Sequence, residues 1–171
     1  MADGVTLDAL DLALLTALRE RPRAGLLELS RSLKVARATV QSRLNRLERA
    51  GVITGYGPDI DLAAAGFPVQ AFVTLEIVQG ALSDVAAYLE GVPGVLEAYA
   101  ITGTGDVLCK VAASSHQDLQ DILLRLNASS LVARSTSVIV LSTVIGSRTL
   151  PLLHSQPRQA TSRAPAFRER S

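Results

Sequence analysis

The chain has 171 residues, enough for one ordinary domain or two small ones, and 48% of them are hydrophobic. One cysteine excludes an internal disulfide framework, and two histidines are too few for a structural zinc site. The net charge of +1 combines basic ends, residues 1–60 and 147–171, with an acidic middle, a distribution that suits a polyanionic partner at one end but decides little alone. No apolar run is long enough for a membrane span and the N-terminus does not read as a secretory signal, so we expect a cytoplasmic protein without membrane contact.

Three helices are predicted in the first third of the chain. Apolar residues at three- and four-residue steps define the first, which Thr6 or Asp8 could cap. A second helix of two to three turns begins near Gly25. After the break at 34–36, a third helix runs from about 37 to 50.

Two helices joined by a tight break, the second polar on its outer side, predict a helix-turn-helix. The N-terminal part of such a recognition helix enters the major groove, so the base-reading candidates are Arg37, Ala38, Thr39, Gln41 and Ser42. Asn45 shares the outer face. Candidate phosphate contacts are Arg43, Arg46 and Arg49, together with Arg31 and Lys34.

Two alternatives remain open for the third helix. It could be a solvated amphipathic helix of a three-helix bundle. Arg43 projects toward the edge of the core, which leaves open an ion pair that braces the motif without touching DNA.

After the third predicted helix, the spacing of the hydrophobic residues changes from the helical period to one that includes the alternation typical of strands. We expect extended backbone at 52–56 and 60–62, and then strand, helix, strand, strand, helix, strand, a split βαβ of ferredoxin-like type. The predicted ranges are strands 69–78, 95–102, 107–112 and 138–145 and helices 83–90 and 118–127. Cys109 is expected in the core of this domain.

The predicted organisation has four parts. Residues 1–54 form the helix-turn-helix domain, 55–66 a linker, 67–146 the βαββαβ domain, and 147–171 a basic, disordered tail. The arginines of the tail either add nonspecific DNA affinity or belong to a harmless appendage.

Many positions along the chain follow a specific joint order and spacing. In the first half they are Leu7-Asp8, Asp11, Leu14-Leu15, Leu18, Arg23, Glu28-Leu29, Val40, Arg43, Leu47-Glu48, Gly51-Val52-Ile53 and Gly55-Tyr56. In the second half they are Gly66, the strand 69–77, Pro93-Gly94-Val95, Tyr99, Thr102-Gly103, Asp106 and 136–141. This pattern resembles the Lrp/AsnC family, the feast/famine transcription regulators. The resemblance implies an α+β protein with a winged helix-turn-helix domain followed by a ferredoxin-like effector and oligomerisation domain.

The chain departs from the family pattern at three places. Ala36 stands where the family usually has a serine that caps the recognition helix, and losing a cap costs roughly 0.5–2 kcal/mol. Thr104 and Gly105 replace an often acidic or bulky pair, which puts the identity of the effector in doubt. The tail beyond about Ser147 exceeds the usual family length.

The resemblance implies that the second domain dimerises through its sheet, that dimers assemble further, and that an amino acid binds between subunits. The effector candidates are Gly103, Thr104, Gly105 and Asp106 with Tyr99 and Thr136. Glycine-rich backbone N–H groups suit a carboxylate, and Asp106 suits an ammonium group. The alternative is a hairpin turn whose glycines serve backbone geometry alone.

The sequence thus predicts a sequence-specific DNA-binding regulator gated by an amino acid, a homodimer on an inverted-repeat operator. It is expected to be neither an enzyme nor dependent on a cofactor or metal. Two alternatives stand beside it. One is an enzyme similar to the sirohaem decarboxylases of the same two-domain architecture. The other is a sensing or oligomerisation module that has lost DNA binding, against which the intact helix-turn-helix argues.

Overall fold

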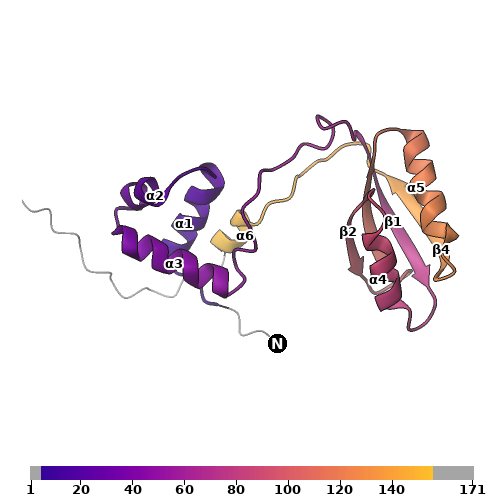
Figure 1. The fold of residues 1–171 in the computed structure, drawn as a ribbon, viewed down its shortest axis with the longest axis horizontal. Coiled ribbons are helices and arrows are strands. Elements are labelled where there is room, and N and C mark those ends of the chain that lie inside the picture. The colour runs from indigo at the N-terminus through magenta and orange to yellow at the C-terminus, as the bar shows by residue number, and fades with distance from the viewer. Residues whose placement is uncertain (1–4, 156–171) are drawn as a thin grey trace, which may run out of the picture. The chain divides into compact units, whose positions relative to one another are not determined.

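The computed structural model describes residues 5–155, which belong to two compact units (Figure 1). The helical unit comprises residues 5–58 and 146–155, and the sheet unit comprises residues 59–145. Each unit has its own hydrophobic core. No helix among the described residues is long and apolar enough to cross a membrane.

The three predicted helices of the helical unit are present as α1 (Ala9–Glu20), α2 (Leu26–Leu33) and α3 (Arg37–Arg49). They enclose a core of leucine, valine and alanine side chains: Leu14, Ala17, Leu29, Val40, Leu44 and Leu47. Lys34, in the left-handed conformation with φ 54°, makes the tight turn between α2 and α3. This turn fixes the crossing of the two helices and thereby the outer face of α3.

The helix N-termini differ in how they are capped. Asp8 caps α1 in a reciprocal box, in which its carboxylate accepts from Asp11 N and that of Asp11 accepts from Asp8 N, both at 2.9 Å. Ala36 at the start of α3 makes no side-chain cap bond, as the sequence implies. The first N–H groups of α3 therefore remain available to an outside acceptor.

The extended backbone predicted at 52–56 and 60–62 does not become strand in the structure. Gly51, at φ 68°, ends α3, and Val52 N returns to Leu47 O at 2.9 Å. Around Asp61 the chain makes a turn instead, because the Asp61 carboxylate accepts from Ala63 N and Ala64 N.

The stretch predicted as a disordered tail from residue 147 contains a helix, α6 (Leu150–Ser155), which packs on α1. Thr16 Oγ1 and His154 Nε2 lie 3.1 Å apart. Leu12, one turn before Thr16, is 3% exposed although it does not belong to the three-helix core. The C-terminal segment therefore completes the surface of α1. The rest of the predicted tail, 156–171, lies outside the described residues.

The sheet unit has the predicted βαββαβ order. Its elements are β1 (Val69–Ile77), α4 (Leu82–Glu90), β2 (Val95–Ala100), β3 (Val107–Ala113), α5 (His116–Ala128) and β4 (Val132–Ile139). The strands run antiparallel in the order β2-β3-β1-β4, so β2 and β4 form the edges. The helices α4 and α5 share a core with alternate strand residues such as Val73 and Cys109, which are fully buried.

Two predictions for the sheet unit are wrong in detail. The last strand is β4 at Val132–Ile139, earlier than the predicted 138–145. β4 is an edge strand and is mostly exposed, so it lacks the alternating apolar pattern that marks a half-buried strand. The largely apolar stretch 140–145, which suggested a strand, includes Leu141 at 97% exposure. The hydrophobic spacing of the predicted helix 83–90 also suggests Leu82 and Ala86 as inward-facing residues, but both are exposed, and Val85 and Leu89 provide the buried face of α4.

Candidate nucleic-acid interface and effector loop

The outer face of α3 is exposed and slightly hollowed. The concave surface is lined by Ala38, Gln41, Ser42, Asn45, Arg46, Arg49 and Ala50. It thus brings together most of the predicted DNA-reading residues. Thr39 is half-buried on the flank, and Arg37 is exposed at the first position of the helix.

Within this concave surface, Gln41 Nε2 donates to Asn45 Oδ1 at 2.8 Å. The two residues are one helical turn apart, so the bond runs along the exposed face of α3. It leaves the Gln41 carbonyl and the Asn45 amino group to pair with another molecule. A donor and an acceptor one turn apart suit the edges of bases in a major groove.

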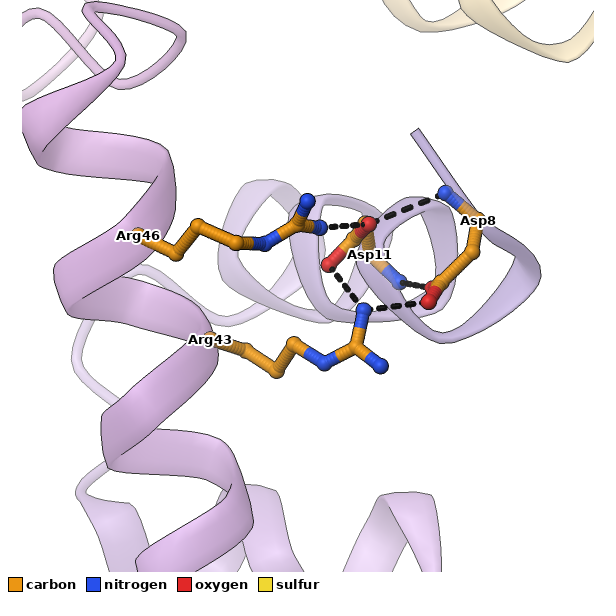
Figure 2. Close-up of polar contacts among 4 residues, drawn as sticks. All are labelled: Asp8, Asp11, Arg43 and Arg46. Carbon is orange, nitrogen blue, oxygen red and sulfur yellow. Dashed lines mark hydrogen bonds and ion pairs between the residues drawn. The ribbon is translucent and has the colours of Figure 1, made fainter. Parts of the chain in front are cut away.

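Arg43 and Arg46, both predicted as phosphate contacts, reach across to α1 (Figure 2). Arg43 Nη1 donates to Asp11 Oδ1 at 3.1 Å and also to Asp8 Oδ2, and Arg46 Nη2 donates to Asp11 Oδ2. The Asp11 side chain is fully buried, whereas the side chains of Arg43 and Arg46 are 30% and 41% exposed. For Arg43 this is the bracing ion pair that the sequence left open.

The ion-pair cluster of Asp8, Asp11, Arg43 and Arg46 sets the charge state of its buried member. Burial by itself raises the pKa of Asp11, but hydrogen bonds from Arg46, the Asp8 backbone and Arg43 outweigh it, so this pKa lies below its ordinary value. For Arg43, burial lowers the pKa, and the bonds to Asp8 and Asp11 raise it above its usual value. Both partners therefore remain ionised at neutral pH.

The sequence did not single out Asp8 and Asp11 as parts of this site. The available signal was a capping aspartate followed three residues later by a second acidic residue, combined with arginines on the inner edge of the third helix. Such a capping pair predicts only a helix start. Its ion pairs to α3 depend on how the two helices cross.

The other predicted phosphate contacts, Arg31, Lys34 and Arg49, are exposed, as is the base-reading candidate Arg37. The described part of the chain gives none of the four an ion-pair partner. Exposed, unpaired cations around a helix with a polar face produce an attractive potential for phosphates. They are therefore better placed than Arg43 for phosphate contact.

The predicted effector loop, residues 103–106, folds over the end of β1. Asp106 N donates to Leu75 O at 2.9 Å, and Asp106 Oδ2 accepts from Ile77 N at 2.8 Å. Gly103 has φ 115°, as a glycine turn requires. A Cβ on Gly105 would collide with Thr74 Cγ2, so this glycine serves a close approach of backbone to β1.

The other two effector candidates lie on the uncovered face of the sheet. Register places Tyr99 on β2 opposite Leu108, Leu108 opposite Thr74, and Thr74 opposite Thr136 on β4. Thr136 therefore adjoins Thr74, against which Gly105 packs, whereas Tyr99 lies at the far edge. The Tyr99 hydroxyl donates to Glu97 on its own strand, and this bond raises the pKa of Tyr99.

Residues 5–155 contain no grouping of three His, Cys, Asp or Glu side chains that could hold a metal ion. The chemistry on offer is polar recognition: an exposed amide and hydroxyl face on α3, and a backbone loop with one carboxylate at the end of β1.

Comparison with known proteins identifies both units. A winged helix-turn-helix DNA-binding family model matches residues 7–54, and the Lrp/AsnC ligand binding domain matches residues 70–150. The transcriptional regulator LrpA of Mycobacterium tuberculosis is 34% identical over 143 residues, which cover 83% of this chain and 95% of that protein.

Solved structures agree with these matches. Escherichia coli AsnC superposes with a TM-score of 0.80 at 28% identity, covering 86% of this chain and all of that one. A transcriptional regulator of Neisseria meningitidis in complex with L-methionine gives 0.78 at 29% identity, covering 87% and 99%. The chain belongs to the Lrp/AsnC family of helix-turn-helix transcriptional regulators.

Proposed function

We propose that the protein regulates transcription by inserting α3 into the major groove of a specific double-stranded operator. The observation that carries this proposal is the exposed polar face of α3, held on the α1–α2 scaffold by a short turn. A recognition helix reads bases through its N-terminal part, which here holds Ala38, Gln41 and Ser42. The exposed arginines Arg37 and Arg49 supply phosphate contacts.

We further propose that an amino acid binds at the loop 103–106 and modulates DNA binding. Asp106 uses Oδ2 to hold Ile77 N, and in the described residues its Oδ1 has no partner, so it can accept from an ammonium group. In this proposal the carboxylate of the amino-acid ligand lies against the loop backbone around Gly103 and Gly105. Thr136 lines the same side of the sheet. The complex of the Neisseria relative with L-methionine supports an amino-acid ligand.

The uncovered face of the sheet supports a homodimer. Its exposed apolar side chains include Phe72 at 42% and Val138 at 64% exposure, adjacent across β1 and β4. Burying such a face against a second copy removes apolar area from water. A two-fold dimer would place two α3 helices on an inverted-repeat operator, and further assembly of dimers would follow on other surfaces.

One binding experiment tests the DNA proposal. A duplex selected from a random library by the wild-type protein is titrated by fluorescence anisotropy against a scrambled duplex, at low and moderate salt. We expect Gln41→Ala and Ser42→Ala to change the sequence preference, and Arg37→Ala or Arg49→Ala to reduce the salt slope by about 0.9 per lost contact. Arg125→Ala is the charge-matched control, because Arg125 is exposed on α5, outside the helical unit and away from the open face of the sheet. If no duplex is preferred over the scrambled one, the proposal fails.

The effector and the dimer need their own readouts. Repeating the titration with a pool of the twenty amino acids, and then with L-methionine alone, reveals modulation as a shift in affinity. Light scattering of Val138→Asp tests the dimer, with Leu124→Asp as control because Leu124 is 60% exposed on α5, away from the open face. Only Val138→Asp is expected to yield monomers.

The relatives compared above carry names of transcriptional regulators, which supports regulation over the enzyme alternative. Absorption spectra of a tetrapyrrole recorded with and without the protein would detect an enzyme of the sirohaem-decarboxylase type.

A further inference from the structure

We propose that Asp11, on α1, is a positioning residue that sets how well α3 discriminates its operator from other DNA. The proposal rests on the DNA-binding function proposed above. Asp11 is not among the residues that line the concave surface on α3, but its carboxylate holds Arg46, which is. Figure 2 shows the link between the two helices.

The Asp11 carboxylate is engaged on both oxygens. Oδ2 accepts from Asp8 N at 2.9 Å and from Arg46 Nη2, and Oδ1 accepts from Arg43 Nη1 at 3.1 Å. With no exposed surface, the carboxylate cannot exchange these bonds for water. It therefore fixes the Arg46 guanidinium in one orientation.

Arg46 retains hydrogen-bonding capacity in that orientation. Its Nη1 carries no bond to the other residues of the cluster in Figure 2, its side chain is 41% exposed, and it lies between Ser42 and Arg49 on the concave surface. A guanidinium held in place before binding loses less conformational entropy when it meets DNA than a free one. Holding Arg46 thus favours the geometry of one bound register over others.

The same cluster lowers indiscriminate attraction. Two carboxylates balance the two guanidiniums, so Arg43 and Arg46 add no net charge to the general pull on phosphates. Removing the Asp11 charge should therefore strengthen binding to any DNA while it weakens the fixed geometry of Arg46. Both changes reduce the preference for the operator.

Asp8 provides a matched control. It sits three residues earlier on the same helix end and pairs with Arg43 but not with Arg46. Asp8→Asn and Asp11→Asn change the net charge equally, and asparagine caps a helix as well as aspartate does. Both variants weaken the pairing of Arg43, but only Asp11→Asn removes the charged partner of Arg46, and it does so at a fully buried position.

The experiment measures the ratio of affinities for the selected duplex and the scrambled duplex. We expect Asp11→Asn to lower this ratio about tenfold, the change that ~1.4 kcal/mol produces, and Asp8→Asn to change it less than about twofold. Equal ratios for the two folded variants would overturn the inference. If the wild-type protein selects no duplex at all, the failure belongs to the proposed function.

A second variant covers the case in which Asp11→Asn does not fold, as judged by circular dichroism. Arg46→Lys keeps the charge and leaves Asp11 paired with Arg43, but it replaces the planar guanidinium with a point charge. We expect the same loss of discrimination with an unchanged salt slope. A ratio equal to that of the wild-type protein would refute the positioning role.

Discussion

Tyr99 and Thr136 lie on opposite edge strands of the sheet, at the two ends of one cross-strand row that passes through Leu108 and Thr74. Three strand spacings of about 4.8 Å separate them, which is more than a small amino acid spans. Within one chain, a single amino acid that contacts Thr136 therefore does not also reach Tyr99. A contribution from Tyr99 would have to come from a second copy.

We predict that Gly105→Ala abolishes amino-acid binding while DNA binding persists. The new methyl group would overlap Thr74 Cγ2, and a threonine on a strand has little freedom to turn away. Calorimetric titration with L-methionine measures the loss.

The double variant Gly105→Ala/Thr74→Ser removes the Cγ2 methyl group that causes the overlap, so ligand binding should return. If the single variant binds L-methionine like the wild-type protein, the loop is only a structural turn.

Acid should weaken the helical unit through Asp11. A carboxyl group with a lowered pKa in the folded state contributes stability above its unfolded value, 3.8, and this contribution disappears as the pH falls below that value. At pH 7 we expect Asp11→Asn to cost ~3 kcal/mol, the lower end for one partner of a buried pair, because both arginines are partly exposed. Urea unfolding at pH 7 and at pH 3 should show this difference shrink. A difference independent of pH would contradict the role of the charge.

Deleting residues 147–171 should destabilise the helical unit but leave the sheet unit unchanged. The deletion removes α6, which packs on α1, and leaves Thr16 without His154. Hydrogen exchange should show faster amides in α1, with unchanged protection in β1 and β3. Deleting only 156–171 is the control, because α6 then remains.

The shorter deletion also tests the arginines at 158–170 as DNA contacts. A salt slope equal to that of the full chain would exclude such contacts.

The thiol of Cys109 should resist modification in the folded protein. Its side chain is fully buried in the sheet core, and burial raises its pKa to about 11. We expect Ellman's reagent at pH 8 to react slowly in buffer and rapidly in urea. Fast reaction of the folded protein would mean that the sheet opens readily.

Sequence reasoning located the helices and strands whose burial is periodic. The apolar residues around Leu14 and around Val40 recur at three- and four-residue steps, as on a helix, and those around Val73 recur at every second residue, as on a strand. Each spacing is typical of one secondary structure, so α1, α3 and β1 were predictable. The position of strand β4 was predicted wrongly because an edge strand buries few of its residues and therefore shows little alternation of apolar and polar residues. The largely apolar stretch 140–145, by contrast, looks like a buried strand in the sequence. The structure shows that stretch largely exposed.

The candidate sites were predictable only in part. The exposed residues of α3 follow from projecting a helix, which is why Gln41 and Ser42 were found on the outer face. The pairing of Arg46 with Asp11 spans 35 residues and depends on the angle between two helices, which no local pattern encodes. Likewise, the distance of Tyr99 from Thr136 follows from strand order, which the sequence of elements alone does not specify.

The helical unit draws on both ends of the polypeptide, since α6 lies on α1 while the sheet unit occupies the middle. During synthesis, α1 to α3 leave the ribosome before the sheet unit, but α1 lacks the helix that packs on it until residues 150–155 have emerged. The strands β1 and β4 pair directly, and Val140 N still bonds Gln70 O beyond them, so the chain enters and leaves the sheet unit at neighbouring points. The sheet unit is thus an insertion within the helical unit. The unit proposed to bind DNA is therefore begun before the sheet unit is translated and completed only after it.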